Sequence, residues 1–545
     1  MKRKLVRIFL LAEVILSLCA CQGQGLVQQT IGPGDDSAQW VNINGVLRVC
    51  EDTPDIVDPQ CTSGYYTVAL NVFDRLVEVS TSENGSEIVP SLAESWEISD
   101  DGLTYTFHLV PNVHFSNGNE LTASDVLYTF KRLLTYPRSV NQSLVSQIKG
   151  AKDLREGNST ELEGFKILGD LDFAITLEKP YAAFLACLST PGASIFDEET
   201  TEEAGIGFGV DPKVTIGTGP FVFSEWEHGV SMTLVANPDC WSGGPKCREV
   251  DILFNCDVEA QRILFEGDKL DILDLEKLSN EAEYFIRGDI YQDRLVCGSR
   301  VGIAYIALNQ SIAPLDDVKV RKALQMAVDR NLLLLASYGG RGQIENGIFP
   351  HGLIGFNPDL AEITYSQDRA RKLLKETGHT DDIQLDLVCQ VAENQGDLCS
   401  IIASMWEKIG VHVNIIDMDD ETFMEHRKAG ELQCYTGMWS ADFNDPDNFI
   451  STFFGSKEES LSRSIGYSDE KIIKRISDAK AIVDTDKRIE EYRSLEEVIV
   501  QEQCSWIPLY SLQHYFVVRD GVEGFKVSWN GWSSSSYRNV SIEGK

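Results

Sequence analysis

Two short stretches, Ile383-Gln-Leu-Asp-Leu387 and Val411-His-Val-Asn-Ile415, decide the fold of this chain. Each alternates apolar and polar residues, which is the period of a β-strand with one buried face. Between them, residues 397–409 have the length of a helix, and Gly410 stands where helices commonly end. A strand, a helix and a second strand joined by short connections predict an α/β layer.

The same order continues beyond the second strand. Residues 420–429 are expected to form a helix and residues 433–438 a third strand. Ligands of such sheets bind beyond the carboxyl ends of the strands. The segment Trp439-Ser-Ala-Asp-Phe-Asn-Asp-Pro-Asp-Asn448 follows the third strand at such an end, so we expect a binding site there.

The acidic residues of this segment differ in their expected roles. Asp445 precedes Pro446, so Asp445 is expected to cap a helix that closes at Gly455. Asp447 would then be a first-turn acid. Asp442 lies before the cap and close to an aromatic residue, which makes it the candidate partner for a cationic group. From spacing alone, an Asx-turn that holds the loop explains Asp442 equally well.

The remaining elements are marked by their ends and by their periodicity. Together they predict an ordered protein of mixed α and β structure from Leu47 onward. The expected elements are strands over residues 103–109 and 173–177, a helix that starts with a capping box at Thr122 and Asp125, a helix over residues 318–330 capped by Asp317, and a helix over residues 366–377 that ends at Gly378.

The first twenty residues have the composition of an export signal. Basic residues at Lys2, Arg3, Lys4 and Arg7 precede an apolar run over residues 8–18 that Glu13 interrupts. This run is shorter than the roughly 18 to 20 apolar residues that cross a bilayer, so we expect a signal that is removed.

The end of this signal, Leu18-Cys19-Ala20-Cys21, is similar to a bacterial lipoprotein signal, in which a cysteine is acylated and becomes the new N-terminus. Cys21 is the predicted lipidation site. Cys19 fits worse because Leu18 would stand directly before the cut, and an ordinary secreted protein with two structural cysteines is the alternative. Residues 21–44 are then expected to form a lipidated flexible stalk.

Composition limits the possible partners. The chain has 545 residues and a formal net charge of -36. It repels other polyanions, which argues against nucleic acid and acidic lipid surfaces, whereas cationic or zwitterionic solutes are tolerated or attracted. Acidity that only maintains solubility is an equally good explanation. Such a length, with 43% hydrophobic residues, predicts two or three packed units.

Cysteine usage indicates an oxidising exterior. Of the 13 cysteines, eleven follow Cys21, and three pairs lie close in sequence. None has the spacing of a zinc site. The expected local disulfides are Cys50 with Cys61, Cys240 with Cys247, and Cys389 with Cys399.

Motifs of catalysis are missing from the sequence. There is no His-Glu-x-x-His and no nucleophile elbow. Gly205-Ile-Gly-Phe-Gly209 follows an acidic stretch rather than a strand, and Asp417-Met-Asp419 lacks the glycine and the terminal glutamate of a calcium loop. We therefore expect a protein that is not an enzyme and that holds no cofactor or metal.

Several groups of residues, in the same order along the chain, resemble the extracytoplasmic solute-binding proteins of ABC importers, specifically the large oligopeptide- and dipeptide-binding family (family 5). The match runs nearly end to end. The groups are Pro90-Ser-Leu-Ala-Glu-Ser-Trp96 with Leu103-Thr-Tyr-Thr-Phe-His-Leu109, Phe115-Ser-Asn-Gly118, Thr122-Ala-Ser-Asp125, Ile216-Gly-Thr-Gly-Pro-Phe221 with Ala236-Asn-Pro-Asp239 and Trp241, Val320-Arg-Lys-Ala-Leu324 with Ala327-Val-Asp329, and Trp506-Ile-Pro-Leu-Tyr510.

The resemblance implies the fold and its limits. It implies two α/β lobes around a cleft, the periplasmic-binding-protein-like fold, with an extra subdomain in the first lobe. The first lobe would comprise residues 45–300 plus 510–545 and the second lobe residues 301–509. The chain would cross between them near residues 299–309 and 508–512.

The resemblance also implies a ligand and its site. In peptide-binding members, an aspartate of the Trp-x-x-Asp segment pairs with the α-ammonium group of the ligand. This aspartate maps onto Asp442, with Trp439 and Ser440 beside it, and Tyr65 falls near the first-lobe segment that touches ligand. Arg341 and His351 lie in a loop that could meet a ligand carboxylate or be merely exposed.

The implied function is capture of di- to oligopeptides at the extracytoplasmic face of the membrane and their delivery to ABC permease subunits. The protein is expected to be a monomer held to the membrane by its lipid anchor. A non-peptide solute, such as a metal chelate or an oligosaccharide, and a peptide-sensing receptor stay open as alternatives.

Overall fold

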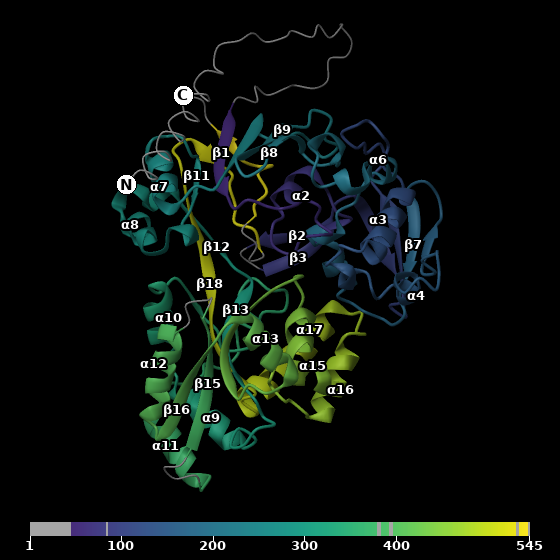
Figure 1. The fold of residues 1–545 in the computed structure, drawn as a ribbon. Helices are drawn as coiled ribbons and strands as arrows, with labels where there is room; N and C mark the ends of the chain where they lie inside the picture. The colour runs from purple at the N-terminus through teal and green to yellow at the C-terminus, as the bar shows by residue number, and fades with distance from the viewer. Residues whose placement is uncertain (1–44, 83–84, 379–382, 392–395, 530–533, 543–545) are drawn as a thin grey trace, which may run out of the picture. The chain divides into compact units, whose positions relative to one another are not determined.

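The computed structural model describes residues 45–82, 85–378, 383–391, 396–529 and 534–542. The predicted signal, the predicted lipidation site Cys21 and the predicted stalk lie outside the described residues. Within the described ranges the chain forms helices and strands throughout (Figure 1), as expected for a mixed α and β protein. In the same ranges we find no helix with the length and apolar character needed to cross a bilayer.

The largest sheet has eight strands and contains the predicted α/β layer. β15 (Ile383–Gln390) pairs in parallel with β16 (Val411–Met418) and with β17 (Cys434–Ser440). β17 also pairs in antiparallel fashion with β13 (Gly302–Leu308), whose residues are all buried. The predicted layer is confirmed, and β17 ends at the start of the candidate binding segment.

A strand of 13 residues, β18 (Trp506–Val518), runs through both parts of this sheet and is the long yellow strand in Figure 1. Its first half pairs with β13, from Trp506 to Tyr510. Its second half pairs with β12 (Leu295–Ser299) and β11 (Ile272–Asp274). Because β12 leads directly into β13, the chain passes between the two parts of the sheet at two neighbouring places. A short strand, β14 (Gly342–Ile344), pairs with β18 between them.

Helices pack against this sheet and bury its apolar side chains in two clusters. Trp406 is fully buried in one of them, and its indole N–H donates a hydrogen bond to the backbone oxygen of Leu324 (3.2 Å). The helices are α9 (Val318–Ala327), α10 (Arg330–Tyr338), α11 (Gln367–Glu376), α12 (Gly396–Glu407), α13 (Asp420–Ala429), α14 (Pro446–Phe454), α15 (Lys457–Ser462), α16 (Glu470–Ala479) and α17 (Thr485–Glu496), followed by a π-helical turn, Glu497–Glu502.

One helix differs from the prediction. The single helix expected over residues 318–330 is two helices, because α9 ends at Ala327 and Val328 has extended backbone angles (φ -89°, ψ 117°). The side chain of Asp329 then accepts a hydrogen bond from the backbone N–H of Leu332 and begins α10. The expectation was wrong because apolar residues continue through this second cap.

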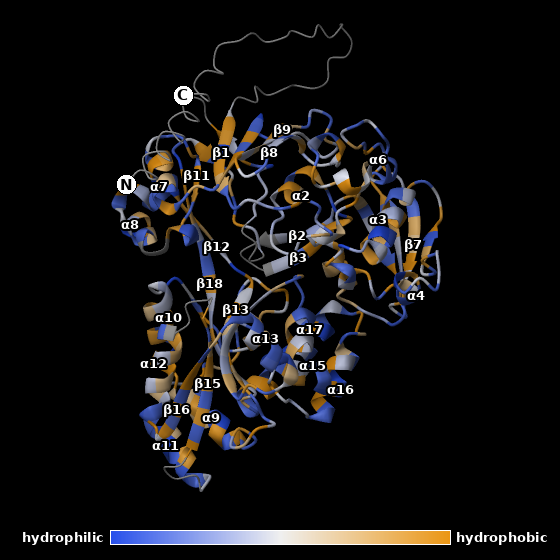
Figure 2. Ribbon diagram, in the orientation of Figure 1, coloured by the Kyte–Doolittle hydropathy of each residue, from blue (hydrophilic) through white to orange (hydrophobic). Residues whose placement is uncertain are grey.

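Two four-stranded sheets, with strand orders β1-β10-β9-β8 and β4-β5-β7-β6, precede β11, and each has its own core. The predicted capping box at Thr122 is present at the start of α3 (Ala123–Thr135), which packs in the second core. The strands of the first sheet that are visible in Figure 2 are coloured mainly as hydrophobic. The strands are β1 (Val46–Glu51), β4 (Ala93–Ile98), β5 (Thr104–Leu109), β6 (Phe165–Ile167), β7 (Asp172–Thr176), β8 (Phe221–Glu227), β9 (Ser231–Ala236) and β10 (Glu249–Phe254).

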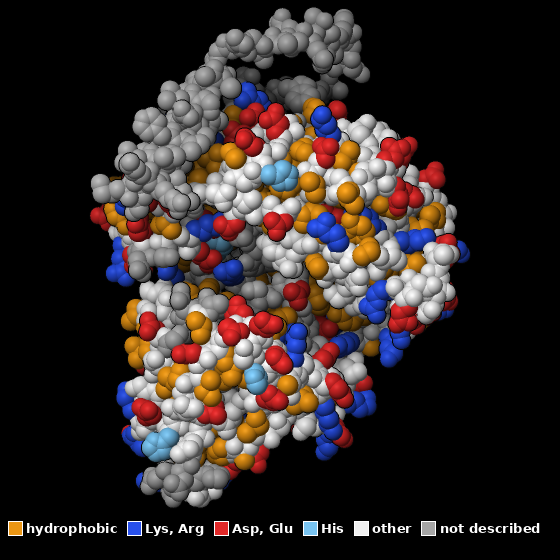
Figure 3. All heavy atoms as spheres, viewed as in Figure 1, with side chains coloured by type: hydrophobic (Ala, Val, Ile, Leu, Met, Phe, Trp, Pro, Cys, Tyr) orange, Lys and Arg blue, Asp and Glu red, His pale blue; other side chains and the backbone are white. Residues whose placement is uncertain are grey.

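Acidic and basic side chains are intermixed over the face of the molecule seen in Figure 3, so opposite charges offset one another on that face.

Shorter elements complete the fold. The shorter elements are a hairpin of β2 (Val77–Ser82) and β3 (Gly85–Pro90), the helices α2 (Thr67–Val72), α4 (Ala151–Arg155), α5 (Phe184–Leu188), α6 (Glu198–Ala204), α7 (Val258–Glu266) and α8 (Ala282–Arg287), and a strand pair of β19 (Val522–Glu523) and β20 (Ser541–Ile542).

The predicted disulfides have different outcomes. Cys389 and Cys399 are joined to each other. Cys240 and Cys247 are separate buried thiols, and the sulfur of Cys240 is 3.4 Å from the hydroxyl oxygen of Ser242. The prediction for the second pair was wrong because the fold gives these two cysteines different surroundings.

The predicted disulfide between Cys50 and Cys61 is also absent from the structure. Cys50 interacts with Cys256, which follows the neighbouring strand β10. The thiol of Cys61 donates a hydrogen bond to Asp58 (3.3 Å). Strand pairing thus brings to Cys50 a partner that lies far away in the sequence.

A fully buried carboxylate, Asp271, fastens three strands together. It accepts hydrogen bonds from the backbone N–H of Arg48 (2.8 Å) in β1 and from the guanidinium of the same residue (2.9 and 3.0 Å). The guanidinium of Arg519, at the end of β18, pairs with it at 2.5 Å. Asp271 itself precedes β11, so this one side chain joins β1, β11 and β18.

We expect Asp271→Ala to lower the free energy of unfolding by about 3 to 5 kcal/mol, because it leaves two partly buried guanidinium groups without their partner. Asp520→Ala is the control, since the side chain of Asp520 is 80% exposed and its contact with Arg294 is long, at 3.5 Å. This substitution should change the free energy of unfolding by less than about 1 kcal/mol. Urea unfolding followed by tryptophan fluorescence measures both. Equal effects of the two substitutions would contradict this role of Asp271.

Candidate functional site

The candidate site lies where β17 ends and α14 begins. The backbone N–H of Ala441 donates a hydrogen bond to Val301 (2.8 Å), which fixes the loop to the start of β13. Asp445 then caps α14 by accepting a hydrogen bond from the backbone N–H of Asp447 (2.9 Å), and Pro446 is the first helical residue. The predicted cap is confirmed.

Asp442 projects from this loop and is held by one residue of α14. The side-chain oxygen of Asn448 accepts a hydrogen bond from the backbone N–H of Asp442 (2.9 Å), and the amide nitrogen of Asn448 donates to Oδ2 of Asp442 (3.0 Å). Among the described residues, no hydrogen bond to the other carboxylate oxygen, Oδ1, is found. The loop is therefore anchored while one carboxylate oxygen keeps its capacity to accept.

The surroundings of Asp442 make its negative charge costly. The side chain is reached by solvent, yet protein atoms enclose it on most sides, and this partial loss of water raises the pKa of Asp442. The hydrogen bond from Asn448 and the charge of Arg463 act in the opposite direction. A cation that approached Oδ1 would favour the ionised form of Asp442.

An aromatic wall and two arginines lie on the same side of the site. Trp439, at the end of β17, packs edge-on against Phe453 of α14 (ring centroids 5.5 Å apart). The guanidinium of Arg463 lies 4.7 Å from the centroid of the Trp439 ring. The guanidinium of Arg427, in α13, lies over Phe423, and its buried Nε has no hydrogen-bond partner among the described residues.

The two arginines repel each other. Burial and the neighbouring charge of Arg427 lower the pKa of Arg463, while Asp442 and two tyrosines act in the opposite direction. Two like charges held this close are relieved by an anion. The site thus combines a carboxylate, Asp442, with two guanidinium groups, one of which lies over the indole ring of Trp439.

Residues from the first part of the chain approach the site. Burial raises the pKa of Tyr66 to about 12, and the charge of Asp442 contributes to this shift. The same charge contributes to the raised pKa of Cys187, after burial and the charges of Asp445 and Asp447. Segments next to α2 and in α5 therefore lie within electrostatic range of Asp442.

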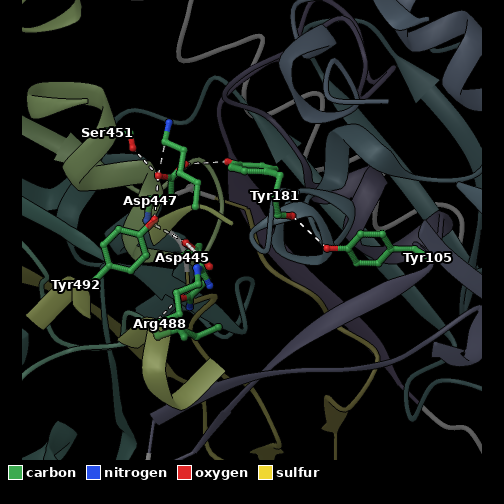
Figure 4. A network of polar contacts seen from close by, with 10 residues as sticks. Tyr105, Tyr181, Asp445, Asp447, Ser451, Arg488 and Tyr492 are labelled. Carbon is green, nitrogen blue, oxygen red and sulfur yellow. Dashed lines mark hydrogen bonds and ion pairs between the residues drawn. The ribbon is translucent and has the colours of Figure 1, made fainter. Parts of the chain in front are cut away.

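A network of polar contacts joins α14 to the earlier part of the chain (Figure 4). The hydroxyl of Tyr181 donates to Asp447 Oδ2 (3.0 Å), and the backbone oxygen of Tyr181 accepts from Tyr105 (3.1 Å). On the other side, Asp447 Oδ1 accepts from Tyr492 (3.1 Å). Next to it, the cap residue Asp445 forms a buried ion pair with Arg488. The helix that holds Asp442 is thus fastened at its N-terminus from both sides.

The structure brings some of the predicted residues together and not others. Trp439, Ser440 and Asp442 lie at one strand end, as the segment predicted. The hydroxyl of Tyr65 is buried close to Glu51 instead, and burial and this neighbouring charge raise the pKa of Tyr65. The adjacent Tyr66 is the residue whose pKa the charge of Asp442 affects. A ligand contact of Tyr65 stays a prediction.

The loop of Arg341 and His351 has its own contacts. The guanidinium of Arg341 donates to the backbone oxygen of Tyr338 (2.9 Å), and the Nδ1 atom of His351 lies 2.8 Å from Glu345. Arg427 lies in α13 and Arg463 directly follows α15. Neither belongs to a sequence motif, so their position near Trp439 and Asp442 could not be predicted from the sequence.

The comparisons with known proteins show the family of this chain. Residues 87–460 match the family model "Bacterial extracellular solute-binding proteins, family 5 Middle". The chain belongs to this family, whose members bind solutes for transport and are not enzymes.

Relatives cover almost the whole chain. Heme-binding protein A of Haemophilus influenzae is 29% identical over 506 residues (89% of each chain), and the dipeptide-binding protein of Escherichia coli is 28% identical over 544 residues (96% of this chain and 98% of that one). The solved structure of HbpA2 from Haemophilus parasuis matches with a TM-score of 0.80 at 26% identity and covers 92% of this chain and 100% of that one. The predicted two-lobed α/β fold is confirmed.

We expect Tyr181→Phe to loosen the N-terminus of α14, because it removes a hydrogen bond to the carboxylate of Asp447 worth about 1 kcal/mol. Amide hydrogen exchange in residues 446–454 should become several-fold faster. Tyr365→Phe, at an exposed tyrosine, is the matched control. Unchanged exchange in Tyr181→Phe would show that α14 does not depend on this contact.

Proposed function

We propose that this protein is the extracytoplasmic, lipid-anchored solute-binding component of an ABC importer and that it captures short peptides between its two lobes. Asp442 carries the proposal, since it is an accessible, partly desolvated carboxylate at a strand end, and no hydrogen bond to its Oδ1 is found among the described residues. The dipeptide-binding relative, which aligns with 96% of the chain, supports peptides as cargo.

The proposed lobes are residues 45–300 plus 510–545 and residues 301–509. Strand pairing supports these limits, because the partner of β18 changes from β13 to β12 within the strand. The direct passage from β12 to β13 would supply the second crossing. Hinge motion at these two places would close the lobes around a ligand and create the form that permease subunits recognise.

The proposed contact for the peptide N-terminus is Oδ1 of Asp442. An α-ammonium group there would form a charge-assisted hydrogen bond, while Asn448 holds the other oxygen. Because Asp442 is partly desolvated and is oriented by Asn448, little of the binding energy is spent on arranging it.

The proposed contact for the peptide C-terminus is Arg463. Its guanidinium is held flat against Trp439 and lies in the field of Arg427, so a carboxylate would relieve the repulsion between the two arginines. Asp442 is within range of Arg463, as its effect on the pKa of Arg463 indicates. A short zwitterionic peptide would therefore find opposite charges for its two ends around one indole ring.

A non-peptide solute is the second candidate. One relative is named as a heme-binding protein, and an indole with one arginine over its ring and a second arginine nearby also suits a planar ligand that carries carboxylates. Hemin has carboxylates but no ammonium group, so it would not need Asp442. The two ligand classes thus differ in their dependence on this residue.

We expect free-amine di- and tripeptides to raise the melting temperature of the protein and N-acetylated peptides to have no such effect. Asp442→Asn should weaken binding of the free-amine peptides by about 2 to 5 kcal/mol, or at least about 30-fold in Kd, since the ammonium loses its partner. Isothermal titration calorimetry measures the change.

Asp239→Asn is the control for that experiment, because it alters an exposed carboxylate in another part of the chain. Arg463→Gln should weaken the binding of peptides with a free C-terminal carboxylate and leave the binding of C-terminally amidated peptides unchanged. Equal binding of acetylated and free-amine peptides, or tight binding of hemin that survives Asp442→Asn, would contradict the assignment of peptides as cargo.

We expect Cys21→Ser to release the protein from membranes into the extracytoplasmic fraction, because a single acyl-bearing residue provides the anchor. Cell fractionation with detergent phase partitioning measures this. Size-exclusion chromatography with light scattering of the released protein should give the mass of a monomer. Membrane attachment that persists in Cys21→Ser would contradict the lipid anchor.

A further inference from the structure

A cavity of about 220 Å³ lies in the second part of the chain, and Asp442 is not among the residues that line it. It has roughly the volume of seven waters at about 30 Å³ each, which is enough for a small organic molecule. Its wall combines two acidic residues, Glu345 and Glu496, with polar and aromatic groups. The others are Ile344, Asn346, Gly347, Phe349, His351, Phe356, Asn357, Pro358 and Leu360.

Glu496 is the unusual member of this wall. It is 1% exposed, and its Oε1 atom accepts hydrogen bonds from the backbone N–H groups of Ile348 (2.6 Å) and Phe349 (2.8 Å). The second oxygen, Oε2, is buried without a hydrogen-bond partner among the described residues. A buried carboxyl oxygen without a hydrogen bond is unfavourable unless a donor group in the cavity supplies one.

Glu345 provides a second carboxylate in the same wall. It is also 1% exposed, and its Oε1 atom accepts from the backbone N–H of His351 (3.0 Å) and lies 2.8 Å from the imidazole. The imidazole of His351 in turn stacks on Phe356 (ring centroids 4.1 Å apart). The cavity wall therefore offers carboxylate oxygens together with aromatic surface.

The basic groups nearby are occupied by backbone oxygens. The guanidinium of Arg330 binds the backbone oxygens of Glu345 and Ile363. The guanidinium of Arg493 binds those of Gly355 (3.2 Å) and Phe356 (2.5 Å). These two arginines fix the loop around the cavity, and neither forms an ion pair with the two carboxylates.

We propose that this cavity is a binding site for a small primary amine, which would place its ammonium group between Glu345 and Glu496 and its short alkyl body against Phe349 and Phe356. An ammonium group donates up to three hydrogen bonds, which suits two carboxylates and an imidazole. Aromatic rings stabilise a neighbouring cation. A metal ion fits less well, because in the described ranges no group of three or more metal-binding side chains is arranged to hold one.

Binding of the amine is coupled to one proton. Burial, with the charge of Glu345, raises the pKa of Glu496 to about 8, against the hydrogen bonds from Phe349 and Ile348 and the charge of Arg493. Glu496 is therefore protonated at neutral pH. When the ammonium group arrives, the carboxyl proton leaves to solvent and an ion pair remains. Affinity should rise as the pH approaches 8, where less of that proton has to be displaced.

The test is calorimetric titration of the full-length protein with butylammonium chloride at pH 7, in two buffers of different ionisation enthalpy. We expect saturable binding in the millimolar range or tighter, with release of close to one proton per amine. 1-Butanol, which has the same alkyl body and no charge, should not bind. Binding should become several-fold tighter at pH 8.

Three variants and a control locate the bound amine. Glu496→Gln should abolish the proton release and weaken binding at least tenfold, and Glu345→Gln should also weaken it at least tenfold. Asp239→Asn, at an exposed carboxylate in another part of the chain, should leave butylammonium binding unchanged. In Asp442→Asn the release of close to one proton per amine should persist, which separates this site from the peptide site. Thermal unfolding of each variant verifies that it is folded.

Two results would overturn the proposal. One is the absence of saturable butylammonium binding to the wild-type protein at both pH values, which needs no variant. The other is binding that Asp442→Asn removes and that Glu496→Gln and Glu345→Gln leave unchanged, since the amine would then occupy the loop after β17.

Discussion

The continuity of β18 is the constraint on which the rest of the structure depends. A single buried strand is hydrogen-bonded to β13 over its first half and to β12 and β11 over its second half. Backbone pairing of this kind cannot shift by one residue without turning every side chain to the opposite face of the sheet. Both parts of the sheet are therefore held in register with each other, and Asp271 reinforces the end of the strand through Arg519.

The loop after β17 uses this frame to hold charges that would be unstable on a flexible segment. Asp442 and Asn448 are tied to each other, Asp445 is paired with Arg488, and Asp447 accepts from Tyr181 and Tyr492. Each carboxylate thus has a separate partner, which keeps acidic groups that are close in sequence from sharing one environment. A helix N-terminus favours this arrangement because its free N–H groups carry partial positive charge.

Prediction succeeded where the signal was local. The capping box at Thr122, the cap at Asp445 and the parallel pairing of β15 with its neighbours follow from residues a few positions apart. It failed where the apolar pattern was followed past a helix cap, as at Asp329, which separates two helices. It also failed for Cys50, whose neighbour Cys256 comes from an adjacent strand.

Composition, strand alternation, helix caps and the order of short motifs were enough to establish the α/β class, the family and the position of Asp442 at a strand end. These properties depend on near neighbours in the chain, whose geometry is set by backbone sterics and local hydrogen bonds. The surroundings of Asp442 were not accessible in this way. Arg463, Tyr66 and Tyr181 reach the loop after β17 from distant segments, and the two buried glutamates meet across a cavity. Packing over long sequence separations places these groups, and no periodicity or spacing in the sequence encodes it.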